Sequence, residues 1–281
     1  MSKKTKHVLV LIAVNVFFVL VCFFVLVPVL YAFSVSLNAE NSLLGSDFSF
    51  LPKHMTLQNY KAVFTEKPVL LWLKNSLILA VTTLVISLGT GIPAAYAFSR
   101  KRFPGRKAIL KLLILLYAFP SLLSMTALYK LLSPMGLINT RTGLIIVYTG
   151  TMAVFALWNM KGYFDTIPVE IEEAAMIDGC GPFRILTSII IPMCKPGIVT
   201  VCMISAMAAW NEYPVALVMV TDPTKATLPV GLANLYEIQR YATDWGALFA
   251  ALVLALIPTV ILFIVGQKQL VQGLSVGGVK G

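Results

Sequence analysis

Long apolar runs constrain this chain most, because they are too long and too numerous for a soluble core. Each has the roughly 17–25 apolar residues that cross a bilayer as a helix: 8–33, 74–98, 109–131, 143–160, 197–220 and 246–266. Only 12% of the side chains are charged and 58% are hydrophobic, whereas soluble chains carry roughly 25% charged residues. The sequence therefore predicts an all-α polytopic membrane protein with six transmembrane helices.

The first apolar run also has features of a signal peptide. Lys3, Lys4 and Lys6 precede it, and the stretch 31–34 loosely resembles a cleavage site. A signal peptide has an apolar region of roughly 7–15 residues, and this run is about twice as long. A retained first transmembrane helix is the preferred interpretation.

Basic residues predict the orientation, because Lys and Arg near the ends of spans stay in the cytoplasm. The N-terminal tail has three lysines, and the turn after the second run has Arg100, Lys101, Arg102, Arg106 and Lys107. Both termini are therefore expected in the cytoplasm. The expected parts are a cytoplasmic tail 1–7, a first helix 8–33, an external loop 34–73, a core 74–266 with five helices, and a cytoplasmic tail 267–281.

The net charge of +10 fits this topology and contact with membrane lipid. The sequence has no basic patch interleaved with aromatic residues, so a nucleic-acid partner is not expected. The chain has only two histidines, His7 and His54, and no G-x-x-x-x-G-K-[ST] motif. No catalytic, metal or ATP site can be assembled from these residues, and a membrane-bound enzyme is disfavoured. The cysteines are expected to be reduced: Cys22, Cys180, Cys194 and Cys202.

The predicted cytoplasmic segment 161–196 differs from the other connections because it is long and interrupted. Asp165 or Thr166 can cap a helix that has Pro168 in its first turn and acidic residues at its positive end. Gly179 suits the left-handed position after a helix, and Pro182 can open a second short helix.

This segment predicts two short helices lying against the inner membrane surface. Ala174 and Ala175 would form a patch small enough for another protein to approach closely. The alternative is an interfacial loop with no partner.

The loop 34–73 is expected to contain a short amphipathic helix within 55–64. The loop 221–245 has Asp222-Pro223 as a turn and Leu228-Pro229 as a break, followed by a polar segment with Tyr236 and Tyr241. It predicts either a site for a protein partner or a solvated connector.

One acidic residue, Glu212, lies well inside an apolar run, and an ionisable group at membrane depth is a functional candidate. Its neighbours Trp210, Asn211 and Tyr213 belong to the same candidate gate or translocation path. Glu212 could hydrogen-bond sugar hydroxyls, or it could stabilise a helix break at Pro214. The structural or gating role is preferred.

The residues Glu173-Ala174-Ala175, Gly179, Ile189 and Pro192 match the pattern E-A-A-x-x-x-G followed by I-x-L-P, with Ile191 in place of leucine. This pattern resembles the permease subunits of binding-protein-dependent ABC importers. Further stretches resemble the carbohydrate-uptake branch, most closely the maltose/maltodextrin permeases: Trp158–Phe164, Trp210–Pro214, Thr227–Leu232 and Gly273–Gly281. The resemblance implies an ABC importer type I permease fold in a bacterial inner membrane.

The resemblance also implies roles for individual residues. The ATPase-coupling residues would be Glu173, Ala174, Ala175, Asp178, Gly179, Ile189 and Pro192. Contacts with the extracellular sugar-binding protein would come from Tyr236, Glu237, Gln239, Arg240 and Tyr241. Tail contacts with the ATPase would come from Gly277, Gly278 and Lys280.

The implied partners are a second homologous permease subunit, a dimer of ATPase subunits that bind ATP and Mg, and the sugar-binding protein. The expected cargo is maltose or maltodextrin, with another oligosaccharide or glycerol phosphate as alternatives. An ion-coupled secondary sugar transporter is the alternative from another class, but it needs more intramembrane ionisable residues than one glutamate.

Overall fold

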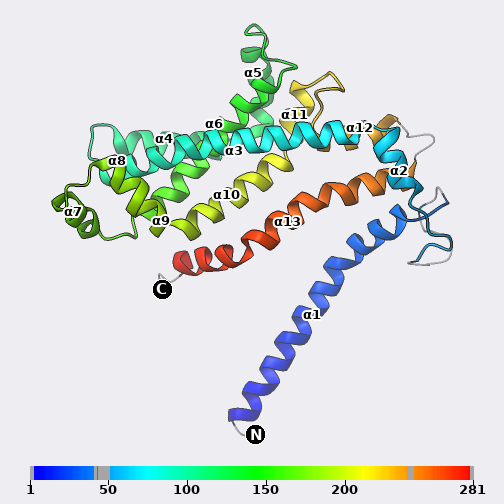
Figure 1. Ribbon diagram of the computed structural model, residues 1–281, viewed down its shortest axis with the longest axis horizontal. Helices are drawn as coiled ribbons and strands as arrows, with labels where there is room; N and C mark the ends of the chain where they lie inside the picture. The colour runs from blue at the N-terminus through cyan, green and yellow to red at the C-terminus, as the bar shows by residue number, and fades with distance from the viewer. Residues whose placement is uncertain (1–2, 41–42, 44–50, 239–243, 279–281) are drawn as a thin grey trace. The chain divides into compact units, whose positions relative to one another are not determined.

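The structure is a computed structural model that describes residues 3–40, 43, 51–238 and 244–278. Within these ranges the chain consists of helices joined by loops and turns (Figure 1). Its elements in chain order are α1 (Lys3–Ser36), α2 (Gln58–Thr65), α3 (Val69–Arg100), α4 (Arg106–Ala118), α5 (Ser121–Leu132), α6 (Arg141–Phe164), α7 (Val169–Ile177), α8 (Pro182–Ile185), the π-helix η1 (Leu186–Ile190), α9 (Ile191–Met193), α10 (Lys195–Trp210), α11 (Pro214–Met219), α12 (Leu228–Ile238) and α13 (Trp245–Gly278).

Four of the described helices, α1, α3, α6 and α13, are each long and apolar enough to cross a membrane. Two bent pairs also qualify if each pair forms one span: α4 with α5, bent by 103°, and residues 182–193 with α10, bent by 80°. By length and composition, the described chain therefore supplies four spans, or up to six. This agrees with the predicted polytopic all-α class.

The predicted spans 109–131 and 197–220 are wrong as continuous helices. The first breaks at Phe119-Pro120, and the second ends at Trp210 before α11 begins at Pro214. Proline has no N–H to donate and its ring clashes with the preceding turn, so a helix interrupted at proline is expected. Leu228-Pro229 was predicted to break the chain, but these two residues form the first turn of α12.

The chain divides into two compact units, residues 1–69 with 232–256, and residues 70–231 with 257–281. In the second unit, α10 and α4 pack against α6. A shared core joins α3, α6 and α10 to the segment that contains α7, α8 and η1. Its buried members are Ala95, Tyr96, Ala156, Leu157, Met160, Phe164, Ile167, Ala175, Ile185, Leu186, Ile190, Cys194 and Val201.

Small residues allow the helices of this unit to approach closely. A Cβ on Gly91 of α3 would lie 2.8 Å from the Ala156 Cβ of α6. A Cβ on Gly197 of α10 would lie 2.7 Å from the Tyr163 ring. Figure 1 shows α7 and α8 at one end of this group of helices, beyond the end of α3 that carries Arg100.

In the first unit, the end of α1 is tied to α2. The Asn59 side-chain amide donates to the Ser36 carbonyl at 2.9 Å, and the Ser36 and Tyr60 hydroxyls lie 2.8 Å apart. The helix α1 continues through the stretch 31–34, which disfavours the cleavage site considered from the sequence. The short helix expected within 55–64 is present as α2, shifted to 58–65.

Residues 267–278 of the expected cytoplasmic tail are helical, because α13 continues to Gly278. Extending a helix that has already formed adds a hydrogen bond for each residue fixed. Each glycine costs only about 1 kcal/mol relative to alanine. No proline interrupts this stretch, so the helix does not end at the edge of the apolar run.

Candidate functional site

The segment between α6 and α10 begins with α7 and ends that helix at a glycine. Gly179 has φ +81°, in the left-handed region, and its N–H donates to the Met176 carbonyl at 3.0 Å. The Cys180 N–H donates to the Ala175 carbonyl at 2.9 Å. These two bonds form a Schellman motif, which satisfies carbonyls at the helix end. The predicted stop at Gly179 is confirmed.

The predicted cap at the start of α7 is wrong. Pro168 occupies the N-cap position, and no side chain caps the helix. Asp165 instead ends α6: its carboxylate accepts from the Ser99 hydroxyl at 2.6 Å and from the Lys161 ammonium at 2.5 Å. The Thr166 hydroxyl donates back to the Tyr163 carbonyl at 2.7 Å. Both side chains are engaged by the end of α6, so neither reaches the N–H groups of α7.

Burial of the Asp165 carboxyl favours its neutral form, but hydrogen bonds from Lys161 and Ser99 outweigh this effect. The pKa of Asp165 is therefore lowered from its usual value of 3.8. This carboxylate stays ionised at neutral pH and holds the ends of α3 and α6 together.

The second short helix begins at Pro182 as predicted. It passes into η1, where the Ile191 N–H donates to the Leu186 carbonyl, five residues earlier. Pro192 follows directly and has no N–H for the ordinary helical bond. The chain then bends by 80° between Pro182–Met193 and α10.

One face of this segment belongs to the core. Ala175 is 7% exposed, and Ile185 and Ile190 are fully buried. The expected outward patch of two alanines is therefore wrong for Ala175, while Ala174 is exposed. Neighbouring residues of an α-helix point about 100° apart, so adjacent alanines do not share a face.

The opposite face is open. Glu173, Ala174, Asp178 and Gly179 are exposed, and Ile177 is 87% exposed. Phe183 on α8 is 79% exposed. Of the other predicted coupling residues, Ile189 is half-buried and Pro192 is exposed. The segment thus presents a mixed acidic and apolar surface while its inner face is held in the core.

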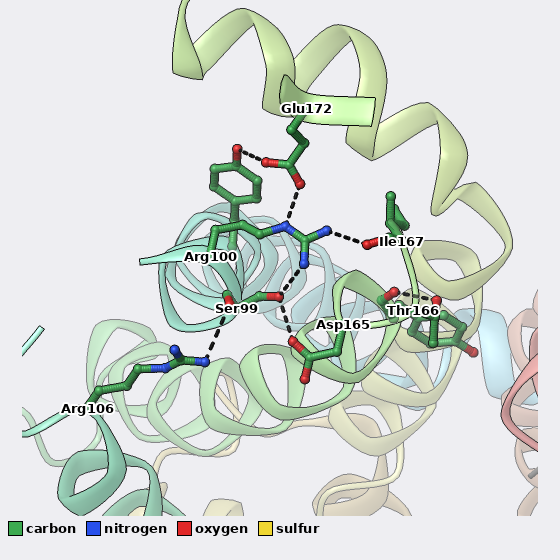
Figure 2. A network of polar contacts seen from close by, with 9 residues as sticks. Ser99, Arg100, Arg106, Asp165, Thr166, Ile167 and Glu172 are labelled. Carbon is green, nitrogen blue, oxygen red and sulfur yellow. Dashed lines mark hydrogen bonds and ion pairs between the residues drawn. The ribbon is translucent and has the colours of Figure 1, made fainter. Parts of the chain in front are cut away.

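A buried ion pair fixes α7 to the end of α3 (Figure 2). Glu172 is 2% exposed; its carboxylate accepts from the Arg100 Nε at 2.5 Å and from the Tyr96 hydroxyl at 2.7 Å. Arg100 also donates to the Ile167 carbonyl at 2.9 Å and to the Ser99 hydroxyl at 3.2 Å. Buried charges are tolerated when they are paired and hydrogen-bonded, and this pair meets both conditions.

The sequence pattern does not predict this network. By sequence, Glu172 belongs to the acidic first turn of the helix and Arg100 indicates topology. A signal was present: Glu172 lies three residues before the core residue Ala175, and residues at i and i+3 share a helix face. A carboxylate on the inner face of α7 needs a cation, and only the tertiary structure shows that Arg100 supplies it.

Glu212 lies in the break between α10 and α11. Its carboxylate accepts from the Val215 N–H at 2.8 Å and from the Ala216 N–H at 3.2 Å, and the Tyr148 hydroxyl also contacts it. Three donors therefore converge on this side chain, an arrangement that fits stabilisation of the break. Of the other gate candidates, Trp210 is buried, Tyr213 is half-buried and Asn211 is exposed.

At the other end of α3, polar side chains hold the loop that precedes α12. The Asn75 amide donates to the carbonyls of Thr224 and Ala226 at 3.0 and 2.9 Å. The Trp72 indole N–H donates to the Pro223 carbonyl at 3.1 Å. The predicted turn at Asp222 is present, with the Lys225 N–H donating to its carbonyl at 3.0 Å.

The candidate binding-protein contacts are described only in part. Tyr236 on α12 is 50% exposed, with its ring 6.1 Å from that of Trp245, and Glu237 follows on the same helix. Gln239, Arg240 and Tyr241 lie outside the described residues. Gly277 and Gly278 end α13, and Lys280 lies outside the described residues.

Among the residues that the structure describes, no group of three His, Cys, Asp or Glu side chains could hold a metal ion. The fold and the site together define a class: a multi-pass helical membrane protein with a two-helix segment at the ends of its spans. One face of this segment is buried in the core and the opposite face is exposed.

Comparison with known proteins assigns the family. Residues 87–276 match the binding-protein-dependent transport system inner membrane component, and the chain belongs to that family. It is accordingly a multi-pass protein of a bacterial inner membrane.

Individual relatives cover most of the chain. The sulfoquinovosyl glycerol transport system permease protein SmoH of Agrobacterium fabrum is 33% identical over 91% of this chain and 89% of that protein. The maltose/maltodextrin transport system permease protein MalG of Yersinia pestis is 35% identical over 94% of this chain and 92% of that protein.

A solved structure gives the same result for the fold. A chain in the crystal structure of a bacterial ABC transporter involved in the import of the acidic polysaccharide alginate is 26% identical, with a TM-score of 0.80. The match covers 95% of this chain and 98% of that one. The fold is that of an ABC transporter permease.

Proposed function

We propose that this chain is a transmembrane subunit of an ATP-driven sugar importer, and that the α7–α8 segment couples it to a separate ATPase subunit. ATP and Mg bind to the ATPase subunits, and a second permease subunit completes the pathway. An extracellular binding protein delivers the sugar. Both termini and the α7–α8 segment lie in the cytoplasm.

One observation carries this proposal: the segment is rigidly held on one side and open on the other. Its outer face offers Glu173 for ionic contact, Ala174 for close approach, and Ile177 and Phe183 as apolar anchors, all exposed. Large exposed apolar side chains rimmed by polar ones mark protein contact sites. A partner protein is therefore favoured over an interfacial loop with no partner.

The inner face provides a route for motion. A displacement of α7 acts on α3 through the Arg100–Glu172 pair and on α6 through the core around Ala175 and Phe164. Packed cores resist continuous deformation. A displacement of the exposed face of the α7–α8 segment should therefore move the ends of α3 and α6 together with the segment. It should not distort the segment locally.

The test of coupling uses a charge reversal on the outer face, Glu173→Arg, in the complex co-expressed with its partner subunits. Glu173 is exposed, so the free energy of unfolding should change by no more than about 0.5 kcal/mol. Co-purification of the ATPase and sugar uptake should both fall. The matched control is Glu66→Arg, another exposed acidic residue, at the end of α2. Undiminished ATPase binding and uptake in Glu173→Arg would refute the coupling role.

We propose maltose or maltodextrin as the cargo, with other oligosaccharides or glycerol phosphate as alternatives. The similarity to MalG supports this choice, whereas SmoH and the alginate transporter are named for different carbohydrates. Uptake by proteoliposomes holding the full complex and its binding protein, with maltotriose competing against a charged oligosaccharide, tests it. Preferential uptake of the charged oligosaccharide would rule out maltodextrin as the cargo.

The rival function is an ion-coupled secondary transporter. Such a protein needs its own ion-coupling groups within the membrane, and the one glutamate predicted there, Glu212, accepts hydrogen bonds from the start of α11. The chain alone in liposomes should show no sugar uptake under a proton or sodium gradient. Uptake under such a gradient would favour the rival function.

A further inference from the structure

The turn between α3 and α4 forms a strongly basic concave surface that the coupling proposal does not use. It borders a shallow, open pocket of about 680 Å³ lined by Arg102, Phe103, Gly105, Arg106, Lys107 and Ala108. Lys101 and Lys111 flank this set, and no Asp or Glu occurs from residue 67 to residue 164. In the described structure, none of these cations forms an ion pair with a carboxylate. The surface therefore carries uncompensated positive charge.

Arg106 stabilises the turn by hydrogen bonds to backbone carbonyls and still has N–H donors free. The Arg106 guanidinium donates to the Lys101 carbonyl at 3.3 Å and to the Ser99 carbonyl at 3.4 Å, the latter drawn in Figure 2. A guanidinium has five N–H donors, so this side chain is positioned by two contacts and retains donors for an anion. Arg102 and Lys107 are exposed, and neither forms an ion pair with a described carboxylate.

The location of the turn points to the membrane surface. It follows α3, which is long and apolar enough to cross a membrane, and precedes the α4–α5 pair, which qualifies as a bent span. A short turn between two spans lies at the depth of the lipid headgroups. Phe103 is 37% exposed beside the cations.

An apolar stripe leads away from the cations along α4. Ile109, Leu112 and Leu116 are 41%, 53% and 61% exposed, and they recur at the helical spacing of three and four residues. No residue of α4 is buried in the described structure. The surface thus presents basic groups at one end and a continuous apolar face beyond them, which matches a ligand with an anionic head and hydrocarbon tails.

We infer that this basic turn, residues 101–107, is a binding site for an anionic phospholipid. The phosphate would lie among Arg102, Arg106 and Lys107, and the acyl chains would follow the apolar face of α4. Basic pockets beside transmembrane helices bind anionic headgroups. Apolar burial alone would not distinguish an anionic lipid from a zwitterionic one.

The experiment uses the complete complex with a local reporter. Phe103→Trp adds a fluorophore within the site, and the parent complex gives the background from the native tryptophans. Brominated phosphatidylglycerol, whose bromine atoms quench nearby tryptophan, is compared with brominated phosphatidylcholine of the same chain length. Phosphatidylglycerol should quench the added signal at about tenfold lower mole fraction. Equal quenching by the two lipids would overturn the inference.

The variant Arg102→Gln/Lys107→Gln removes two exposed cations and leaves Arg106 to hold the turn. Its preference for phosphatidylglycerol should fall from about tenfold to nearly none. The matched control Lys61→Gln/Lys67→Gln loses the same charge from the region of α2 and should retain the preference. Lys107→Gln alone is a milder second variant in case the double variant does not assemble. An unchanged preference in both basic-turn variants would contradict the site.

Two further outcomes would also overturn it. If inorganic phosphate at millimolar concentration abolished the phosphatidylglycerol preference, the turn would bind a soluble anion instead of a lipid. If Arg102→Gln/Lys107→Gln lost a partner subunit while keeping the lipid preference, the turn would be a protein-docking surface. Neither outcome depends on the cargo or on the role of Glu173, so failure here is distinguishable from failure of the proposed function.

Discussion

At the scale of single residues, two features of the α7–α8 segment depend on backbone conformation and charge. Gly179 adopts a positive φ with open space where a Cβ would lie. Glu172 is buried against Arg100. Replacing one member of a buried pair strands the other charge, at a cost of about 3–5 kcal/mol. Glu172 and Gly179 flank the exposed surface formed by Glu173, Ala174 and Asp178 and fix its orientation from either side.

The glycine can be tested against a neighbour. Gly179→Ala should lower the free energy of unfolding by about 1–2 kcal/mol, because an L-residue is strained in the left-handed region. Gly181→Ala should change it by less than about 0.5 kcal/mol, since Gly181 has φ −73° and equally open surroundings. Thermal unfolding of the solubilised protein measures both. Equal effects of the two substitutions would show that the positive φ does not matter.

Asp165 predicts a pH dependence. Its pKa is lowered in the folded protein from the usual 3.8, so its contribution to stability is present above pH 3.8 and is lost as the pH falls through the lower folded value. Because the side chain is 43% exposed, the contribution is about 0.5–1 kcal/mol after solvent screening. The melting-temperature difference between wild type and Asp165→Asn should therefore shrink in acid.

Two comparisons check this pH prediction. Ser99→Ala removes one hydrogen bond to the carboxylate and should reduce the difference at neutral pH. A wild-type advantage that persisted or grew well below pH 3.8 would contradict the assignment.

At the scale of elements, the break between α10 and α11 is stabilised by a side chain. Pro214 cannot donate to the preceding turn, and the next N–H groups, of Val215 and Ala216, bond to the Glu212 carboxylate. Val215 and Ala216 are themselves buried. Without Glu212 these donors would lack an acceptor, and an unsatisfied buried donor costs about 1–3 kcal/mol.

Glu212→Ala should therefore reduce stability by about 2 kcal/mol or more, while the KM for sugar stays unchanged in the protein that remains folded. Tyr148→Phe, which removes only one of the three donors, should have a smaller effect. Thermal unfolding and uptake kinetics in proteoliposomes supply the two readouts. A raised KM with normal stability would instead make Glu212 a sugar contact.

At the scale of the whole molecule, α3 is held at both ends. Tyr96, Ser99 and Arg100 bind the α6–α7 region at one end, and Trp72 and Asn75 bind the loop before α12 at the other. At 1.5 Å per residue, the helix from 72 to 100 spans roughly 40 Å. It is therefore one continuous helix that connects the proposed ATPase contact with the loop before α12, which leads to the proposed binding-protein contact.

The attachment of α3 to the loop before α12 can be tested separately. Asn75→Leu removes both donated bonds to the loop and also the bond that the Asn75 side-chain oxygen accepts from Arg141, so the amides of residues 224–228 should exchange hydrogen faster. Stimulation of the ATPase by sugar-loaded binding protein should also fall. The control Asn15→Leu removes an exposed bond within α1 and should change neither readout. Faster exchange with full stimulation would mean that α3 does not transmit the signal.

Local pattern was sufficient for several features of the fold and site. Apolar runs predicted the membrane class, and Gly179 and Pro182 predicted the end of α7 and the start of α8. These features depend on residues adjacent in sequence, where helix-breaking chemistry acts directly. The cap proposed at Asp165 failed because a residue distant in sequence, Ser99, competes for that carboxylate. The alanine patch failed because packing selected which side of α7 is buried.

The sequence by itself determined that this chain crosses a membrane repeatedly and carries a segment of two short helices, because hydrophobic length and turn chemistry are local properties. Only the tertiary structure decided that Glu172 meets Arg100, that Tyr148 contacts Glu212, and that Ser99 bonds to Asp165. These contacts join residues up to 72 positions apart. Their partners are chosen by packing, which brings distant charges together where burial requires each to be satisfied.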